Sequence, residues 1–213
     1  MCIRDSYYFA LAGAYRHGDL GLAYPLMRGT APVLVALSSF VVLGEVFTPL
    51  AWVGVLGVSA GLLCLGAGGA MLRQNKALAF ALSNAVLIAI YTVVDAKGAR
   101  LSGHVLQYVA LLFALDGWPF ALLVLWHRKG AVMPYIRGRW RLAAGGAVAS
   151  LASYSIALWA MTVAPVALIA ALRETSVLFA VILGAWLLKE PWTRMRVFGT
   201  AFIVMGVMAL RLA

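Results

Sequence analysis

Long apolar runs separated by short polar breaks make up most of the chain. A bilayer core of about 30 Å is crossed by roughly 20 helical residues, and most of the runs approach or exceed that length. We expect helices over residues 20–43, 49–69, 77–95, 104–126, 142–163, 165–188 and 197–212. A shorter apolar stretch over residues 7–15 is typical of the end of a further helix. The pattern predicts an all-α, polytopic membrane protein with about seven full transmembrane helices and a partial one.

Two of the predicted helices share a pattern of charged and small residues. With a shift of 145 positions, Arg28 aligns with Arg173, and the alignment continues without a gap. The further identities pair Thr30 with Thr175, Leu43 with Leu188, Glu45 with Glu190, Gly54 with Gly199 and Gly61 with Gly206. Matches of Gly or Leu are common in apolar sequences, whereas charged residues are rare there. We therefore predict an internal duplication.

The duplication predicts how the chain is divided. We expect residues 7–70 to hold a partial third helix with the fourth and fifth helices of a first repeat, residues 71–76 to be a linker, and residues 77–213 to be a complete second repeat. The start MCIRDS differs in character, and we interpret residues 1–6 as a non-native, adapter-derived segment. An intact parent would then hold ten helices in two repeats of five. Repeats with an odd number of helices insert with opposite orientation, which makes an inverted repeat.

Composition agrees with a membrane protein and excludes several other classes. Hydrophobic residues make up 64% of the chain and charged residues 11%, about half the charged fraction of a soluble domain. The net charge of +10 comes mostly from basic residues between the apolar runs, where they meet lipid headgroups. We expect the lipid bilayer as partner, with no nucleic acid. The two cysteines and three histidines have no metal-ligand spacing, so we expect no metal and no cofactor.

Four charged residues lie inside lipid-length helices and are the first candidates for function. Arg28 and Arg173 are each eight residues into their predicted helices. The inverted arrangement would place them on opposite sides of the midplane, so that they bracket a central cavity and bind an anionic group of a substrate. Glu174 and Asp116 are candidates for proton coupling, because a carboxyl group in an apolar site can load and release a proton. A structural ion network that locks the helices together is the alternative.

Polar and aromatic residues inside the runs are further candidates for a substrate site. We select Tyr24, Asn84, Tyr91 and Tyr154. At about 100° per residue, Asn84, Tyr91 and Asp95 lie on one helix face, although Asp95 is near the expected helix end and is interpreted as an interface anchor. Glu45 and Glu190 recur after equivalent helices, where the helix dipole disfavours an anion. We predict a structural or gate-locking role for both.

The endings of the duplicated helices carry a resemblance to a known family. Val42-Leu43-Gly44-Glu45 and the segment 187–191, Leu-Leu-Lys-Glu-Pro, each followed by a glycine-rich helix, resemble the repeat of the drug/metabolite transporter superfamily of the EamA type. The resemblance covers residues 7–213. It implies a secondary carrier with a central cavity between inverted repeats, which moves small metabolites, amino acids or drugs, often outward, across a bacterial inner membrane. It does not indicate which substrate.

Other readings of the sequence remain open. A channel also needs inward-facing polar groups, a structural membrane protein would explain the small-residue helices but not the repeated arginine, and a truncated chain could be inactive. An enzyme would need a reactive cluster, which the sequence lacks. Orientation is also open: the basic loop over residues 127–141 would be cytoplasmic by the positive-inside rule, whereas the resemblance implies cytoplasmic chain ends, which would place that loop outside.

Overall fold

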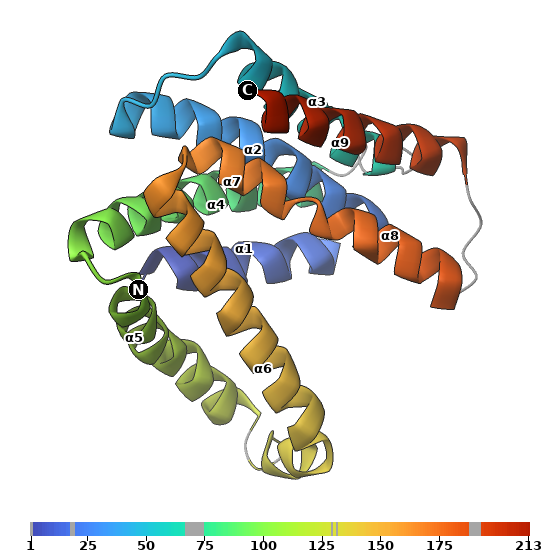
Figure 1. Cartoon of the computed structure of the whole chain (residues 1–213). Coiled ribbons are helices and arrows are strands. Elements are labelled where there is room, and N and C mark those ends of the chain that lie inside the picture. The colour runs from blue at the N-terminus through green and yellow to red at the C-terminus, as the bar shows by residue number, and fades with distance from the viewer. Residues whose placement is uncertain (1, 18–19, 67–74, 129, 131, 188–192) are drawn as a thin grey trace.

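The computed structural model describes residues 2–17, 20–66, 75–128, 130, 132–187 and 193–213. Every regular element in these ranges is an α-helix (Figure 1). In chain order the helices are α1 (Cys2–His17), α2 (Leu20–Leu43), α3 (Pro49–Gly66), α4 (Asn75–Ser102), α5 (Val105–His127), α6 (Val132–Val163), α7 (Val166–Arg173), α8 (Ser176–Leu187) and α9 (Arg194–Leu212). The predicted all-α class is confirmed.

Six segments of the described chain are long and apolar enough to cross a membrane. They are Ala23–Leu43, Lys76–Ser102, Val105–His127, Ile136–Val163, Val166–Leu183 and Arg194–Leu212. The predicted helix over residues 49–69 appears as a shorter apolar helix, Pro49–Leu65 in its apolar part. The protein is therefore a polytopic membrane protein, as its apolar runs predict.

Two helices are longer than their apolar runs. The first, α4, continues beyond its predicted end at residue 95 and ends at Ser102. The second, α6, begins at Val132, ten residues before the expected start, and is kinked at Arg139 (φ −133°, ψ 21°). In both cases polar and basic residues extend a helix beyond its apolar part, because Lys and Arg are good helix formers. An apolar pattern alone therefore underestimates the lengths of these helices.

The predicted helix over residues 165–188 is broken in the middle. Its first part, α7, ends at Arg173, and α8 starts at Ser176. The backbone N–H groups of Glu174 and Thr175 bond to carbonyls three residues earlier, and the Thr175 hydroxyl donates to the carbonyl of Leu172 at 2.7 Å. This tighter turn replaces the regular helical bonds. The prediction of one continuous helix was wrong at this point.

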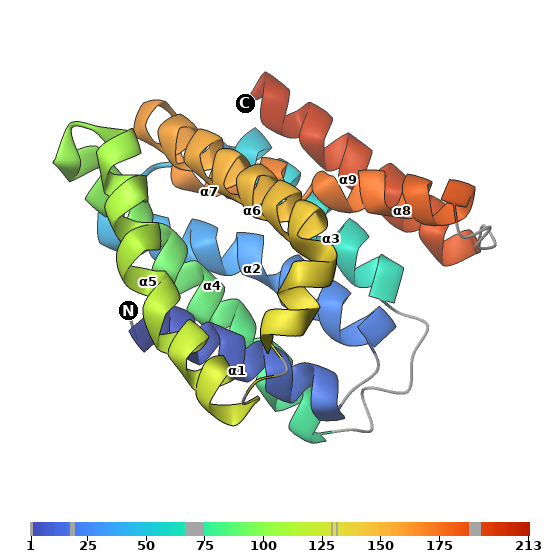
Figure 2. The same ribbon diagram turned by 90° about the horizontal axis from the view of Figure 1, so that it is seen from below.

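The N-terminal segment is part of the helical structure. Residues from Cys2 onward form the first turns of α1, which lies alongside α4 (Figure 2). The sequence prediction set residues 1–6 aside from the fold, and it missed that Arg4 reaches the interior. The helix carries Asp5 in its first turn and Arg16 in its last, an arrangement that suits the helix dipole.

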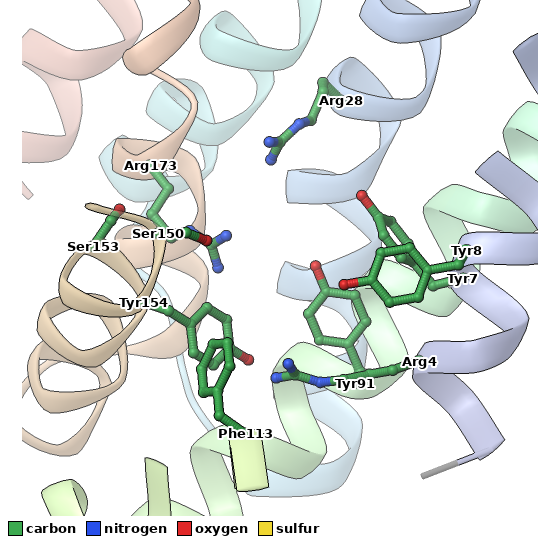
Figure 3. A pocket seen from close by; sticks show the side chains of 10 residues that line it. All are labelled: Arg4, Tyr7, Tyr8, Arg28, Tyr91, Phe113, Ser150, Ser153, Tyr154 and Arg173. Carbon is green, nitrogen blue, oxygen red and sulfur yellow. The ribbon is translucent and has the colours of Figure 1, made fainter. Parts of the chain in front are cut away.

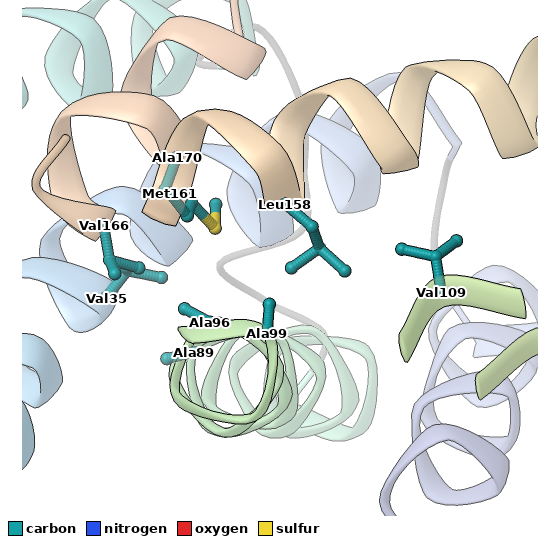
Figure 4. Close-up of a cluster of buried hydrophobic side chains, with 9 residues drawn as sticks. All are labelled: Val35, Ala89, Ala96, Ala99, Val109, Leu158, Met161, Val166 and Ala170. Atoms are coloured by element: carbon teal, nitrogen blue, oxygen red, sulfur yellow. The ribbon is translucent and has the colours of Figure 1, made fainter. Parts of the chain in front are cut away.

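Two of the three apolar clusters that hold the helices together include both α2 and α7. The first joins α2, α4, α5, α6 and α7 through small and branched side chains (Figure 4), which are Val35, Ala89, Ala96, Ala99, Val109, Leu158, Met161, Val166 and Ala170. The second joins α2, α3, α7, α8 and α9 around Val58, Leu62 and Ile203. Outside these clusters, α5 and α6 project away from the other helices in Figure 1 and expose large apolar side chains, a surface suited to lipid.

The closing helices of the two predicted repeats, α3 and α9, pack closely through glycines. A Cβ on Gly61 would lie 2.6 Å from the carbonyl oxygen of Gly199, and a Cβ on Gly206 would lie 2.8 Å from that of Gly54. The 145-residue shift aligns Gly54 with Gly199 and Gly61 with Gly206. Gly61 on α3 therefore contacts the equivalent of Gly54 on α9, and Gly54 contacts the equivalent of Gly61. Such exchanged contacts are those of two equivalent helices that run antiparallel about a two-fold axis. Small residues permit this close approach in lipid.

The glycine contact predicts a position-specific loss of stability. Gly206→Ala would place a Cβ 2.6 Å from the backbone nitrogen of Val58, which forces α3 and α9 apart. We expect the free energy of unfolding in detergent to fall by about 1–3 kcal/mol. Gly145→Ala in α6 is the matched control, because no atom lies within 4 Å of its Cβ position. An equal loss in both variants would contradict the close helix contact.

Candidate functional site

A polar cavity of about 280 Å³ opens between the helices on one side of α2 (Figure 3). Its wall is formed by α1, α2, α4, α5, α6 and the end of α7. The lining side chains are those of Arg4, Tyr7, Tyr8, Arg28, Tyr91, Phe113, Ser150, Ser153, Tyr154 and Arg173. Three arginines and four tyrosines in one cavity provide hydrogen-bond donors and cationic groups, which suits a ligand with an anionic or strongly polar group.

Arg28 is paired with a buried acid across the predicted repeat boundary. Its Nη1 donates to Oε1 of Glu174 at 2.9 Å, so α2 is joined to the break between α7 and α8. Glu174 is only 4% exposed, and its other oxygen, Oε2, accepts no hydrogen bond from the residues that the structure describes. Glu174 therefore meets a basic group, whereas Asp116, the other candidate for proton coupling, faces Arg4.

Arg173 is arranged differently from Arg28. It is the last residue of α7, where the helix dipole favours a cation, and its guanidinium points into the cavity in Figure 3. Its Cζ lies 5.5 Å from the ring centroid of Tyr154, within the range of a cation–π contact. Among the described residues, no carboxylate lies within ion-pair distance of Arg173. The cavity thus contains a cation that its own acids do not pair.

A second, much smaller cavity lies against the same two arginines. Its volume is about 10 Å³, roughly that of one water molecule. The lining combines Arg28, Arg173, Glu174 and Thr92 with five apolar residues. Glu174 therefore lies next to the large cavity but is separated from it by the arginines.

Arg4 occupies the opposite part of the cavity and is bound by two acids. Its Nη2 donates to Asp95 at 2.7 Å, and its Nε lies 3.3 Å from Asp116. The expectation that Asp95 is an interface anchor was wrong: α4 runs seven residues beyond it, and the side chain is buried. The predicted common face of Asn84, Tyr91 and Asp95 is confirmed, since all three contact α1.

The cavity includes four of the six residues predicted to bind substrate. Arg28, Tyr91, Tyr154 and Arg173 line it. Tyr24 lies outside the lining, with its ring centroid 5.6 Å from the guanidinium carbon of Arg28. Asn84 also lies outside the cavity lining. Its Nδ2 donates to the backbone carbonyl of Tyr7 at 2.9 Å and so joins α4 to α1.

Sequence reasoning missed several lining residues. Arg4 was set aside with the first six residues, and Tyr7 and Tyr8 were read as part of a partial helix. Phe113 has no distinguishing signal in an apolar run, whereas the shared face of Asn84, Tyr91 and Asp95 could have indicated a polar partner for α4. The remaining missed residues, Ser150 and Ser153, are small polar groups on α6.

Glu45 connects four helices near the end of α2. Its Oε1 accepts from Arg100 at 2.6 Å, and its Oε2 accepts from the backbone N–H of Val166 at 2.9 Å. Arg100 also donates to the carbonyls of Met161 and Ala164. An acid at the first turn of α7 satisfies a free N–H group there and matches the helix dipole. The equivalent acid, Glu190, lies outside the described residues, so its predicted role stays a prediction.

The Glu45 contacts predict that two substitutions of this residue lower the stability of the protein by different amounts. Glu45→Ala removes the acceptor of the Val166 N–H group and the partner of Arg100, and we expect the free energy of unfolding to fall by about 1–3 kcal/mol. Glu45→Gln keeps a carbonyl oxygen for Val166 and loses only the charge, so its loss should be clearly smaller. Chemical denaturation in detergent measures both, and equal losses would show that the Val166 contact contributes little.

Comparison with known proteins identifies the family. Residues 75–212 match the model of the EamA-like transporter family, which is more than half of the chain and includes α4 to α9. A comparison with curated proteins gives no match. The matched region supplies Tyr91, Tyr154 and Arg173 to the cavity, and the family consists of membrane transporters rather than enzymes. The chain therefore belongs to the EamA-like transporter family and is a membrane transporter of the drug/metabolite transporter type.

Proposed function

We propose that this transporter carries small molecules with an anionic group, and that Arg173 is their main contact. The observation that carries the proposal is the Arg173 guanidinium, which points into the cavity and has no acid partner among the described residues. A cation in a membrane interior needs a counter-charge or water. A carboxylate or phosphate of the transported molecule can supply that charge through two parallel hydrogen bonds.

The break between α7 and α8 supports a transport role for this position. Non-helical backbone is tolerated at membrane depth where it lines a cavity or is covered by protein. Carriers use such broken helices to bring polar groups to a central site. Here the break follows Arg173 directly and contains Glu174, so the two charged residues lie where the backbone departs from the regular helix.

The Arg28–Glu174 pair suggests how binding could be coupled to protons. An anion bound between Arg173 and Arg28 would compete with Glu174 for the Arg28 guanidinium. A buried carboxylate that loses its cation is unstable as an anion and would take up a proton. In this mechanism the substrate takes the place of Glu174 at Arg28 as it binds, and Glu174 takes up a proton. On the other side of the membrane Glu174 loses the proton and pairs with Arg28 again, which releases the substrate.

The remaining parts of the proposal follow from the exchanged glycine contacts and the family. Gly54, Gly61, Gly199 and Gly206 pack as expected for two related units of opposite orientation, which supports an inverted repeat with the cavity between its halves. We infer outward transport of small metabolites, amino acids or drugs at a bacterial inner membrane, as the sequence resemblance implies.

Substitution of Arg173 tests the anion contact. Arg173→Lys keeps the charge but loses the planar fork, and we expect initial rates of transport of a carboxylate or phosphate substrate to fall by about tenfold or more. The measurement uses proteoliposomes and a panel of labelled acids, amino acids, neutral sugars and amines. A rate equal to that of the parent protein would exclude the two-bond contact.

A matched variant separates this contact from a general effect of replacing arginine with lysine. Arg137→Lys changes an exposed arginine of α6 that does not line the cavity, so transport should be unaffected. Equal losses in the two variants would show that the loss comes from replacing any arginine with lysine, and not from the cavity contact. Transport that exchanges labelled for unlabelled substrate and saturates would also distinguish a carrier from a channel.

The coupling role of Glu174 predicts a loss of proton dependence. Glu174→Gln keeps a carbonyl oxygen for Arg28 but cannot bind and release a proton. We expect transport along a substrate gradient to continue. Its acceleration by a proton gradient that runs in the same direction as the substrate gradient should disappear, because substrate and proton cross together in this mechanism. Asp116→Asn is the comparison, because that acid faces Arg4 and not the Arg28 pair. If Asp116→Asn abolishes the acceleration and Glu174→Gln does not, Glu174 is not the proton carrier.

A further inference from the structure

The part of the cavity around Arg4 has the composition of a binding site for an organic cation. Two carboxylates and three aromatic rings surround one guanidinium group, and we call these five surrounding side chains the cation cage: Asp95, Asp116, Tyr91, Phe113 and Tyr154. In Figure 3 the guanidinium of Arg4 extends from α1 toward Phe113 and Tyr154 on the far wall. We propose that the cage binds a guanidinium or protonated amine group of the transported molecule, and that Arg4 occupies it in this structure.

The acids of the cage provide more negative charge than Arg4 neutralises. Asp95 accepts from Arg4 at 2.7 Å, and also from the hydroxyl of Tyr108 at 3.1 Å and from that of Tyr154 at 2.5 Å. Asp116 lies 3.3 Å from Arg4 Nε. Both carboxylates are largely shielded from solvent, at 6% and 12% side-chain exposure. Two shielded acids that share one cation favour a bound cation with N–H donors, because the tyrosine hydroxyls on Asp95 donate hydrogen bonds but supply no counter-charge.

The aromatic rings complete the cage. The guanidinium carbon of Arg4 lies 4.8 Å from the ring centroid of Tyr154, 5.5 Å from that of Tyr91 and 5.6 Å from that of Phe113. All three distances are within about 6 Å, the range in which the face of a ring attracts a cation. Rings on several sides exclude water and leave room for a planar or compact cationic group, which is the arrangement of known aromatic cages.

The cage and its occupant come from different parts of the chain. All five cage residues lie on α4, α5 and α6, within the region that matches the family model, whereas Arg4 lies on α1 outside it. The walls of the cage are thus formed by helices other than the one that carries Arg4. Removal of one side chain should open the site while its walls stay in place.

The cage lies close to Arg173, and this limits which substrates could bind to both. Tyr154 lies near both Arg4 and Arg173, with its ring centroid 4.8 and 5.5 Å from the two guanidinium carbons. A small molecule in this cavity could thus place a cationic group in the cage and an anionic group on Arg173. This assignment to a zwitterionic substrate rests on the proposed function, whereas binding of a cation by the cage does not.

Binding of methylguanidinium to Arg4→Ala tests the cage. The full chain in lipid nanodiscs is titrated with methylguanidinium chloride, and with methylurea as the neutral probe of the same shape. We expect saturable binding of methylguanidinium to Arg4→Ala, at least about tenfold tighter than that of methylurea. The second substitution Asp116→Asn in the Arg4→Ala chain should weaken the binding by about tenfold or more.

A matched variant and a second readout keep the test decisive. Arg16→Ala removes an exposed cation from the same helix and leaves the cage filled, so it should not bind the probe. If Arg4→Ala is unstable without ligand, methylguanidinium should raise its thermal unfolding temperature in detergent and methylurea should not. Equal effects of the two probes, or equal binding by Arg4→Ala and Arg16→Ala, would overturn the proposal.

The result of the methylguanidinium test can be distinguished from the result of the transport test of Arg173. Methylguanidinium has no anionic group, so its binding to Arg4→Ala should persist when Arg173→Gln is added. Loss of anion transport in Arg173 variants with no probe binding to Arg4→Ala would reject the cage alone. Probe binding with normal transport by Arg173→Lys would instead reject the two-bond anion contact and leave the cage in place.

Discussion

The ion pair between Arg28 and Glu174 is the interaction on which the site depends. Charges inside lipid-length helices must face protein or water, and this pair meets the requirement by joining α2 to the break between α7 and α8 at 2.9 Å. The pairing of Glu174 with Arg28 also affects the surroundings of Arg173. Arg173, one residue earlier on a different face of α7, points into the cavity and has no ion-pair partner in the described part of the chain.

Close helix contacts supply the frame around this pair. Glycines on α3 and α9 bring the closing helices within van der Waals distance, and the apolar clusters on either side of α7 fix its position against α2. Glu45 satisfies the N-terminus of the same helix. The broken helix is therefore held at its start by Glu45 and at its end by Arg28, while the cavity faces its last residue.

The apolar pattern predicted the class of protein and most of the helices, because length and hydropathy decide which segments can cross a bilayer. The rarity of charge in such segments also identified Arg28, Arg173 and Glu174. The break after Arg173 was not predictable, since it depends on a turn stabilised by Thr175 and on a partner 146 positions away. The prediction for Asp95 was wrong for a related reason. The apolar run ends at Asp95, but α4 continues through polar residues to Ser102, so that Asp95 lies inside the helix and is buried.

The most direct test of this arrangement is a double-mutant cycle on the buried pair, with unfolding measured in detergent for Arg28→Met, Glu174→Gln and the double variant. Removal of one partner leaves the other as an unpaired buried group, whereas removal of both does not. We expect the double variant to lose clearly less stability than the two single losses combined. Losses that add to within about 0.5 kcal/mol would contradict a direct ion pair between α2 and the broken helix.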